Sequence, residues 1–402
     1  VLACFSGFAP RNLIAKKTFL TELYLINDSE HSLNAPTVTI SQKNGPTQTP
    51  LRFPSLQPGE MWKLPVTISA DGPDGDSPSG PSADGESMLI LTVHENGKEI
   101  GRNEFEIFVQ DPAALRLSPR PRSELAVWGN HPELQAFLKR LRLPFHTVNA
   151  VPENHGDILL LLPGISGNDL KTVAKWVEQG GKAVALELDS LCDDLRLRTM
   201  SSGFRDWTEL TLKRHPLFAG LGQDQFRYWN GKEGDPGSME LFRNAILPLN
   251  DGVLAMSMTF NYRMGMTVAE FRHGNGRWLI SQLRALERLG YDSVATRYLF
   301  NLLDYTAGGF NDPRAPQLIT GKTGTRTYSV APDRIVPIDL RPYANMGFRD
   351  DTAHDRKGGW SDHGPDHDAR MFPVGKRTFA GILFDVIDPA QNNGKSCLVL
   401  AG

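Results

Sequence analysis

Two hydrophobic periods divide the chain. Up to about Pro112, apolar and polar residues alternate in short runs separated by turn residues, which is typical of β-strands with one solvent-facing side. In the first long run, Phe19, Leu23 and Leu25 share one face. No helical period interrupts this region. The alternation predicts strands over residues 19–26, 37–41, 61–68, 88–93 and 104–109.

From Glu124 to Gly309 strands alternate with amphipathic helices. Apolar residues at relative positions 0, 3, 4 and 7 predict one helix through Leu134, Phe137, Leu138 and Leu141, and another through Leu170, Val173, Ala174 and Val177. We expect strands at 125–128, 145–148, 157–162 and 182–188, a hairpin over 267–282 and a final helix at 293–306. This alternation implies a parallel sheet covered on both faces, as in flavodoxin-like and Rossmann-like folds.

The expected fold class is therefore multidomain. We assign an all-β immunoglobulin-like sandwich to residues 1–112, an α/β flavodoxin- or Rossmann-like domain to residues 113–313 and a third, β-rich domain to residues 314–402. Residues 70–87, rich in Gly, Pro, Ser and Asp, predict a solvated loop, because Pro73 breaks the pattern of a calcium loop. Since the chain opens on Val1 and its last domain is short, we expect an internal portion of a longer protein.

Composition and charge narrow the classes of partner. The net charge is −3 and no basic block is present, so nucleic acid is not expected as a partner. No apolar run reaches the roughly 18 residues that a membrane span needs. The three cysteines, Cys4, Cys192 and Cys397, lie in separate segments and match neither a zinc pattern nor a disulfide framework.

The usual catalytic motifs are missing from the sequence, and we expect no catalytic residue. An amidotransferase places a cysteine on a tight strand-to-helix turn, but no glycine beside Cys192 allows such a turn. The glycines at 129 and at 321–324 match neither a dinucleotide-binding nor a P-loop pattern in context. Glu187 and Asp189 lie at a strand end, where α/β folds place sites, and we interpret them as solvated acids.

The acidic, glycine-rich stretch at 347–389 carries a ligand-binding signal around Trp360. A tryptophan face stacks on a pyranose ring while neighbouring polar groups bond its hydroxyls, which makes Trp360, Asn345, Asp362 and Arg370 candidate carbohydrate-binding residues. The six aspartates and three histidines of residues 350–368 fit calcium weakly, and a solvated surface loop is the equal alternative. No other cofactor is expected.

Trp229 is a further candidate sugar contact, because it lies in a segment with a glycine two residues away. Such a tryptophan projects toward a neighbouring domain or packs its own segment onto the sheet. Both alternatives stay open at the level of sequence.

Several phrases of the chain resemble carbohydrate-active enzymes. Residues 176–182, 215–221, 274–282 and 301–305 resemble the glutamine-amidotransferase-like domain that follows the catalytic barrel in several glycoside hydrolases. The 347–389 stretch resembles the opening of their carboxyl-terminal galactose-binding-like jelly-roll modules, so residues 314–402 would be the start of a truncated jelly-roll. The domain order resembles the region after the barrel in glycoside hydrolase family 2 proteins.

This resemblance implies a non-catalytic accessory portion of a retaining β-glycosidase whose catalytic barrel lies outside the chain. It implies poly- or oligosaccharides, other domains of the same polypeptide and a second copy of the chain as partners, and a periplasmic or extracellular bacterial location. One alternative is a stand-alone carbohydrate-binding or structural protein. Another is a small-molecule hydrolase or amidotransferase that uses Cys192 of the α/β domain.

Overall fold

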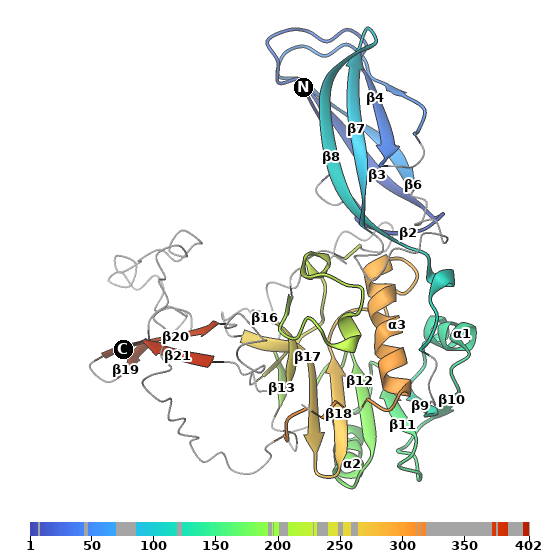
Figure 1. The fold of residues 1–402 in the computed structure, drawn as a ribbon, viewed down its shortest axis with the longest axis vertical. Coiled ribbons are helices and arrows are strands. Elements are labelled where there is room, and N and C mark those ends of the chain that lie inside the picture. The colour runs from blue at the N-terminus through green and yellow to red at the C-terminus, as the bar shows by residue number, and fades with distance from the viewer. Residues whose placement is uncertain are drawn as a thin grey trace.

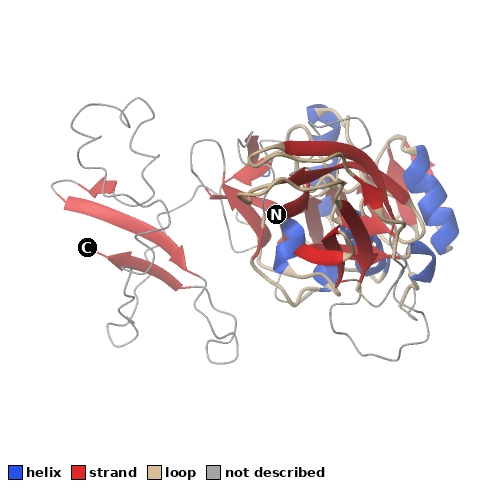
Figure 2. Ribbon diagram, turned by 90° about the horizontal axis from the view of Figure 1, so that it is seen from above, coloured by secondary structure: helices blue, strands red, loops and turns tan. Residues whose placement is uncertain are grey.

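The computed structural model describes residues 1–6, 9–43, 47–69, 86–118, 123–191, 195, 197–200, 208–227, 229–230, 240–247, 252–258, 264–310, 312–313 and 315–318, and three strands between residues 372 and 401 (Figure 1). Strands predominate over helices in these residues, and the strands form several separate sheets (Figure 2). The chain is thus a β-rich, multi-sheet protein.

Two sheets enclose the amino-terminal core. Their strand orders are β1-β3-β6 and β2-β8-β7-β4-β5. Leu23 and Leu25 of β3 pack in one cluster with Val38 and Leu91 of the other sheet, which makes this part a β-sandwich. All strands predicted in this region are present, and the bounds are β1 Leu2–Phe5, β2 Asn12–Ile14, β3 Thr18–Ile26, β4 Thr37–Gln42, β5 Leu51–Arg52, β6 Met61–Ser69, β7 Glu86–Glu95 and β8 Lys98–Gln110.

A ten-stranded sheet with the order β10-β9-β11-β12-β18-β17-β15-β13 forms the middle part, and β16 joins β17 and β14 beside it. The neighbours from β10 to β18 run parallel, whereas β17, β15, β13, β16 and β14 pair antiparallel. The strands are β9 Leu125–Trp128, β10 Phe145–Val148, β11 Ile158–Leu161, β12 Lys182–Leu186, β13 Arg198–Met200, β14 Glu209–Leu210, β15 Ala245–Leu247, β16 Val253–Met258, β17 Met264–His273 and β18 Gly276–Ser281. The expected parallel pairing is therefore limited to the strands from β10 to β18, and the hairpin predicted over residues 267–282 is confirmed as β17–β18, where antiparallel pairing begins.

Alternate residues of the parallel strands enter two different cores. Leu125 and Val127 of β9 pack with helices α1 (Pro132–Leu141) and α3 (Ser293–Ala307), whereas Ala126 packs with α2 (Gly167–Glu178). Both faces of the parallel strands are therefore covered, as expected, and all three helices occur where the periodicity predicts them. Short 3-10 helices η1 (Pro112–Ala114), η3 (Pro216–Phe218) and η4 (Gln223–Phe226) complete this part.

The β17–β18 hairpin turn requires its glycines. Gly274 has a φ of +58°, and a Cβ there would lie 2.3 Å from the Glu178 carbonyl oxygen. A Cβ on Gly276 would lie 2.0 Å from the Val177 carbonyl oxygen. The hairpin can thus pack against the carboxyl end of α2 only with glycine at both positions.

A buried polar network joins the sandwich to the middle part. Asn12 of β2 donates from Nδ2 to Asp292 Oδ2 at 2.8 Å, and the Asn230 backbone N–H donates to the same oxygen at 2.6 Å. Asp292 also caps α3, since its Oδ1 accepts from the Ala295 N–H at 2.8 Å. Asn12, Asn230 and Asp292, hereafter the junction network, are all less than 10% exposed.

Strands β19 (Phe372–Val374), β20 (Arg377–Phe384) and β21 (Cys397–Ala401) form a three-stranded antiparallel sheet near the carboxyl end. Apart from residues 315–318 and these three strands, the region 314–402, for which a jelly-roll is expected, lies outside the described residues. In the part of the chain that the structure describes, no helix is both long and apolar enough to cross a membrane.

Candidate functional site

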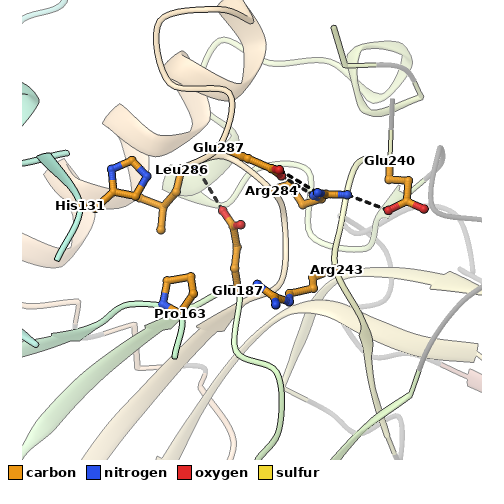
Figure 3. Close-up of a pocket in the computed structure, with 8 residues that line it drawn as sticks. All are labelled: His131, Pro163, Glu187, Glu240, Arg243, Arg284, Leu286 and Glu287. Atoms are coloured by element: carbon orange, nitrogen blue, oxygen red, sulfur yellow. Dashed lines mark hydrogen bonds and ion pairs between the residues drawn. The ribbon is translucent and has the colours of Figure 1, made fainter. Parts of the chain in front are cut away.

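An open cavity of about 560 Å³ lies at the carboxyl ends of the parallel strands (Figure 3). Its size falls within the range of about 300–1,000 Å³ that small-molecule sites occupy. Because parallel strands end at the same edge of a sheet, the segments after β9, β11, β12 and β18 meet there. The residues that line the cavity are His131, Pro163, Glu187, Glu240, Arg243, Arg284, Leu286 and Glu287.

Glu187 occupies the turn directly after β12. Its φ is +52°, in the left-handed region that residues other than glycine rarely adopt. Its backbone N–H donates to the Ser281 carbonyl of β18 at 2.8 Å, which keeps the turn against the sheet. This turn places the side chain at the strand end in the cavity lining.

The carboxyl group of Glu187 is buried rather than solvated. The residue is 5% exposed, and its Oε1 accepts the backbone N–H of Leu286 at 2.9 Å. Among the described residues, no group donates to its second carboxyl oxygen. Our interpretation of Glu187 as a solvated acid is therefore wrong, because a segment 99 residues away covers it. Asp189, with a side chain 57% exposed, is solvated as expected.

Burial raises the pKa of Glu187 from 4.5 to about 7. The Leu286 N–H and the Arg284 and Arg288 guanidinium groups oppose the shift in pKa, and the Glu287 carboxylate adds to it. Glu187 therefore changes its protonation state near neutral pH, in contact with a cavity.

The other charged side chains of the cavity are paired with one another. Arg284 donates from Nη1 to Glu240 Oε2 at 2.7 Å and from Nη2 to Glu287 Oε1 at 2.8 Å, and its Nε also bonds Glu287 (Figure 3). Arg243 forms an ion pair with Asp189. Glu187 thus differs from its charged neighbours, because its only hydrogen-bond partner among the described residues is a backbone amide.

Among the residues that line the cavity, the sequence singled out Glu187, at a strand end, but not the charged residues around it. Glu240, Arg243, Arg284 and Glu287 lie in segments without regular structure, and nothing in their spacing indicates that they meet. The position of His131 could have been predicted, because a proline follows it at the first position of α1 and marks it as the helix cap. In the structure, His131 Nδ1 accepts the Leu134 N–H at 3.2 Å as this cap.

Of the residues predicted to bind carbohydrate, the structure describes Trp229 alone. Trp360, Asn345, Asp362 and Arg370 lie outside the described residues, as do Cys192 and the calcium candidate at 350–368. Trp229 is 0% exposed, donates from Nε1 to the Gln225 carbonyl at 3.0 Å and packs against Tyr298 of α3. Its ring therefore packs against the core of the middle part, which was the second of the two alternatives given for Trp229.

Metal-ligating side chains do not cluster in the described part of the chain. No group of three or more His, Cys, Asp or Glu residues there has an arrangement that could hold a metal ion.

Comparisons with known proteins give distant structural likenesses. No family model and no curated protein match the chain. It is similar to the CARDB domain of the PF1109 protein from Pyrococcus furiosus, with 16% identity, 27% of this chain and 87% of that chain covered, and a TM-score of 0.20. It is also similar to a β-galactosidase from Rahnella sp. R3, with 13% identity, 46% of this chain and 32% of that chain covered, and a TM-score of 0.26. A third similar structure is a β-glucosidase from Listeria innocua, with 12% identity, 27% of this chain and 16% of that chain covered, and a TM-score of 0.19. At these TM-scores the likenesses assign neither fold family nor function.

Proposed function

We propose that this chain is a non-catalytic accessory portion of a carbohydrate-active enzyme, and that its edge cavity binds a hydroxyl-rich ligand. The observation that carries the proposal is the identity of the residue on the turn after β12. An amidotransferase would present a thiol on such a strand-end turn, whereas this chain presents the buried carboxyl group of Glu187.

The chemistry of the cavity supports binding of a polar ligand. Arg243, Arg284, Glu187, Glu240 and Glu287 supply donors and acceptors around a space of about 560 Å³. Sugars need such convergent polar groups, because each hydroxyl that leaves water must regain its hydrogen bonds. Arg284 is held by Glu240 and Glu287, and Arg243 is held by Asp189, which limits the side-chain entropy lost when a ligand binds.

The proposal also assigns a domain type to each of three regions of the chain. Residues 1–112 would be an immunoglobulin-like domain, residues 113–313 an amidotransferase-like domain without a nucleophile, and residues 314–402 the start of a jelly-roll in which Trp360, Asn345, Asp362 and Arg370 contact a saccharide. The phrases that resemble family 2 glycoside hydrolases support this order. A catalytic barrel elsewhere in the parent protein and an exported bacterial location follow from the resemblance.

Calorimetric titration with neutral β-linked oligosaccharides tests the proposal. Arg243→Ala should weaken saccharide binding by about tenfold, since a hydrogen bond to a charged group contributes roughly 1.5–3 kcal/mol. Arg102→Ala is the matched control, because Arg102 is also an exposed arginine paired with a carboxylate, that of Glu104. It should leave the affinity unchanged.

Two results would contradict the proposal. One is the absence of any saccharide binding by the folded chain. The other is rapid labelling of Cys192 by an electrophile at neutral pH together with amide or ester hydrolysis that Cys192→Ser abolishes, which would favour the amidotransferase or hydrolase alternative.

A further inference from the structure

We propose that the edge cavity selects ligands that carry a primary ammonium group beside hydroxyl groups, as amino sugars do, with the Glu187 carboxylate as the ion-pair partner. The inference rests on the proposed function, because it takes the cavity as a site for hydroxyl-rich ligands. It adds the chemical class that the cavity prefers.

The first reason is the half-satisfied carboxyl group of Glu187. Its Oε1 is held by the Leu286 N–H at 2.9 Å, and none of the described residues donates to the second oxygen. Buried carboxylates generally take several hydrogen-bond donors or a cation. Since Glu187 lines the cavity (Figure 3), a ligand there can supply the missing donor.

The second reason is the balance of charge. Arg284 is engaged by both Glu240 and Glu287, and Arg243 is engaged by Asp189. Both arginines are therefore neutralised within the protein. An anionic ligand would have to break these pairs, whereas an ammonium group would pair with the carboxyl group of Glu187, which forms no ion pair with the described residues.

The third reason is the absence of a competing metal site in the described cavity lining. The carboxylates of Glu240 and Glu287 turn toward Arg284, and no three acidic or histidine side chains of the described residues converge. A divalent ion needs several such ligands at once. One ammonium group, in contrast, needs one carboxylate and a few neutral acceptors.

The affinity of the cavity for an ammonium ligand should depend on pH. The charged or titratable groups around Glu187 are Arg284, Glu287 and Arg288 on the segment after β18, Glu240 and Arg243 before β15, and His131 after β9. With the pKa of Glu187 at about 7, only its deprotonated form pairs with an ammonium group. A primary alkylammonium group such as that of glucamine, with a pKa of about 10, stays charged through this pH range. Affinity should therefore rise about tenfold from pH 6 to pH 8, and binding at pH 6 should release a proton.

Calorimetry with two matched polyols tests the inference. Glucamine carries an ammonium group where sorbitol carries a hydroxyl group, and the two are otherwise identical. We expect glucamine to bind at least tenfold more tightly than sorbitol at pH 8, to weaken about tenfold at pH 6, and to release protons in buffers of different ionisation enthalpy.

Glu187→Gln should abolish both the preference for glucamine and its pH dependence. The glutamine Oε1 can still accept the Leu286 N–H, so the turn is expected to stay folded. Glu270→Gln is the matched control, because Glu270 is a glutamate 2% exposed that does not line the cavity. It should bind both polyols as the parent chain does.

Equal affinity for the two polyols, or a glucamine preference that survives in Glu187→Gln, would overturn the inference. If neutral oligosaccharides still bind in that case, the proposed function stands and only the ligand class is wrong. If no saccharide or polyol binds, both proposals fail together. The pH dependence and proton release of the parent chain keep the test valid even if the Glu187 variant fails to fold.

Discussion

Two buried carboxyl groups of this chain have opposite surroundings. Asp292 belongs to the junction network, and its two oxygens accept three N–H groups, from Ala295, Asn12 and Asn230. Glu187 at the edge cavity accepts one N–H among the described residues. Burial raises the pKa of both groups, to about 6 for Asp292 and about 7 for Glu187.

The comparison shows that burial and a raised pKa do not by themselves mark a binding site. The difference lies in how fully the oxygens are satisfied and in whether the group lines a cavity. A fully satisfied carboxylate holds three segments of the chain together, whereas a half-satisfied one beside open space can receive a ligand.

The largest effect is expected for Asp292→Ala. It removes the Asp292 acceptor from three buried N–H groups, so the free energy of unfolding should fall by about 4 kcal/mol, since the loss of one buried hydrogen-bond partner costs roughly 1–3 kcal/mol. Urea denaturation measures this loss. Asp111→Ala is the control, since Asp111 also caps a helical turn but its bond to Ala113 lies at the surface. A loss of less than about 1 kcal/mol in Asp292→Ala would break the comparison.

The second effect concerns pH and Glu187. A carboxyl group whose pKa is about 7 when folded and 4.5 when unfolded binds more protons in the folded state, so its contribution to stability falls as pH rises between these values. Glu187→Gln removes this titration. From pH 5 to pH 8 the variant should gain about 2–3 kcal/mol of unfolding free energy relative to the parent chain. Urea denaturation at both pH values measures the gain, and parallel stability curves would contradict the raised pKa.

The smallest effect on stability is expected for Arg243→Ala. The Arg243–Asp189 pair is exposed, with side-chain exposures of 40% and 57%, so its loss should change the unfolding free energy by less than about 1 kcal/mol. Thermal denaturation checks this. A large loss of stability would show that the cavity rim holds the fold together, as the junction network does, and would remove the contrast between the two regions.

Much of the fold could be predicted from the chain. Strands β9 and β10 have the bounds predicted from the sequence, and α1 and α2 follow the spacing of Leu134 and Leu170 with their neighbours. The β17–β18 hairpin was predicted, but the rest of the antiparallel half was not, because β13, β14 and β15 are two or three residues long and their pairing is not local.

The site was predictable only in part. The position of Glu187 at the end of a buried strand was visible, but the Leu286 amide that covers it was not. Likewise, the sequence left two alternatives for Trp229, and the contact with Tyr298 decides its place. Polar and aromatic residues in irregular segments carry no period, so their partners cannot be deduced from spacing.

By itself, the sequence determined which apolar side chains of the strands and helices leave water, because the periods of these elements place them on one face whatever the tertiary arrangement is. Only the tertiary structure decided how the buried carboxyl groups of Asp292 and Glu187 are hydrogen-bonded and whether each lines a cavity. The environment of such a group depends on donors and charges from distant segments, and those meet only when the strands have paired and the loops have closed over their ends.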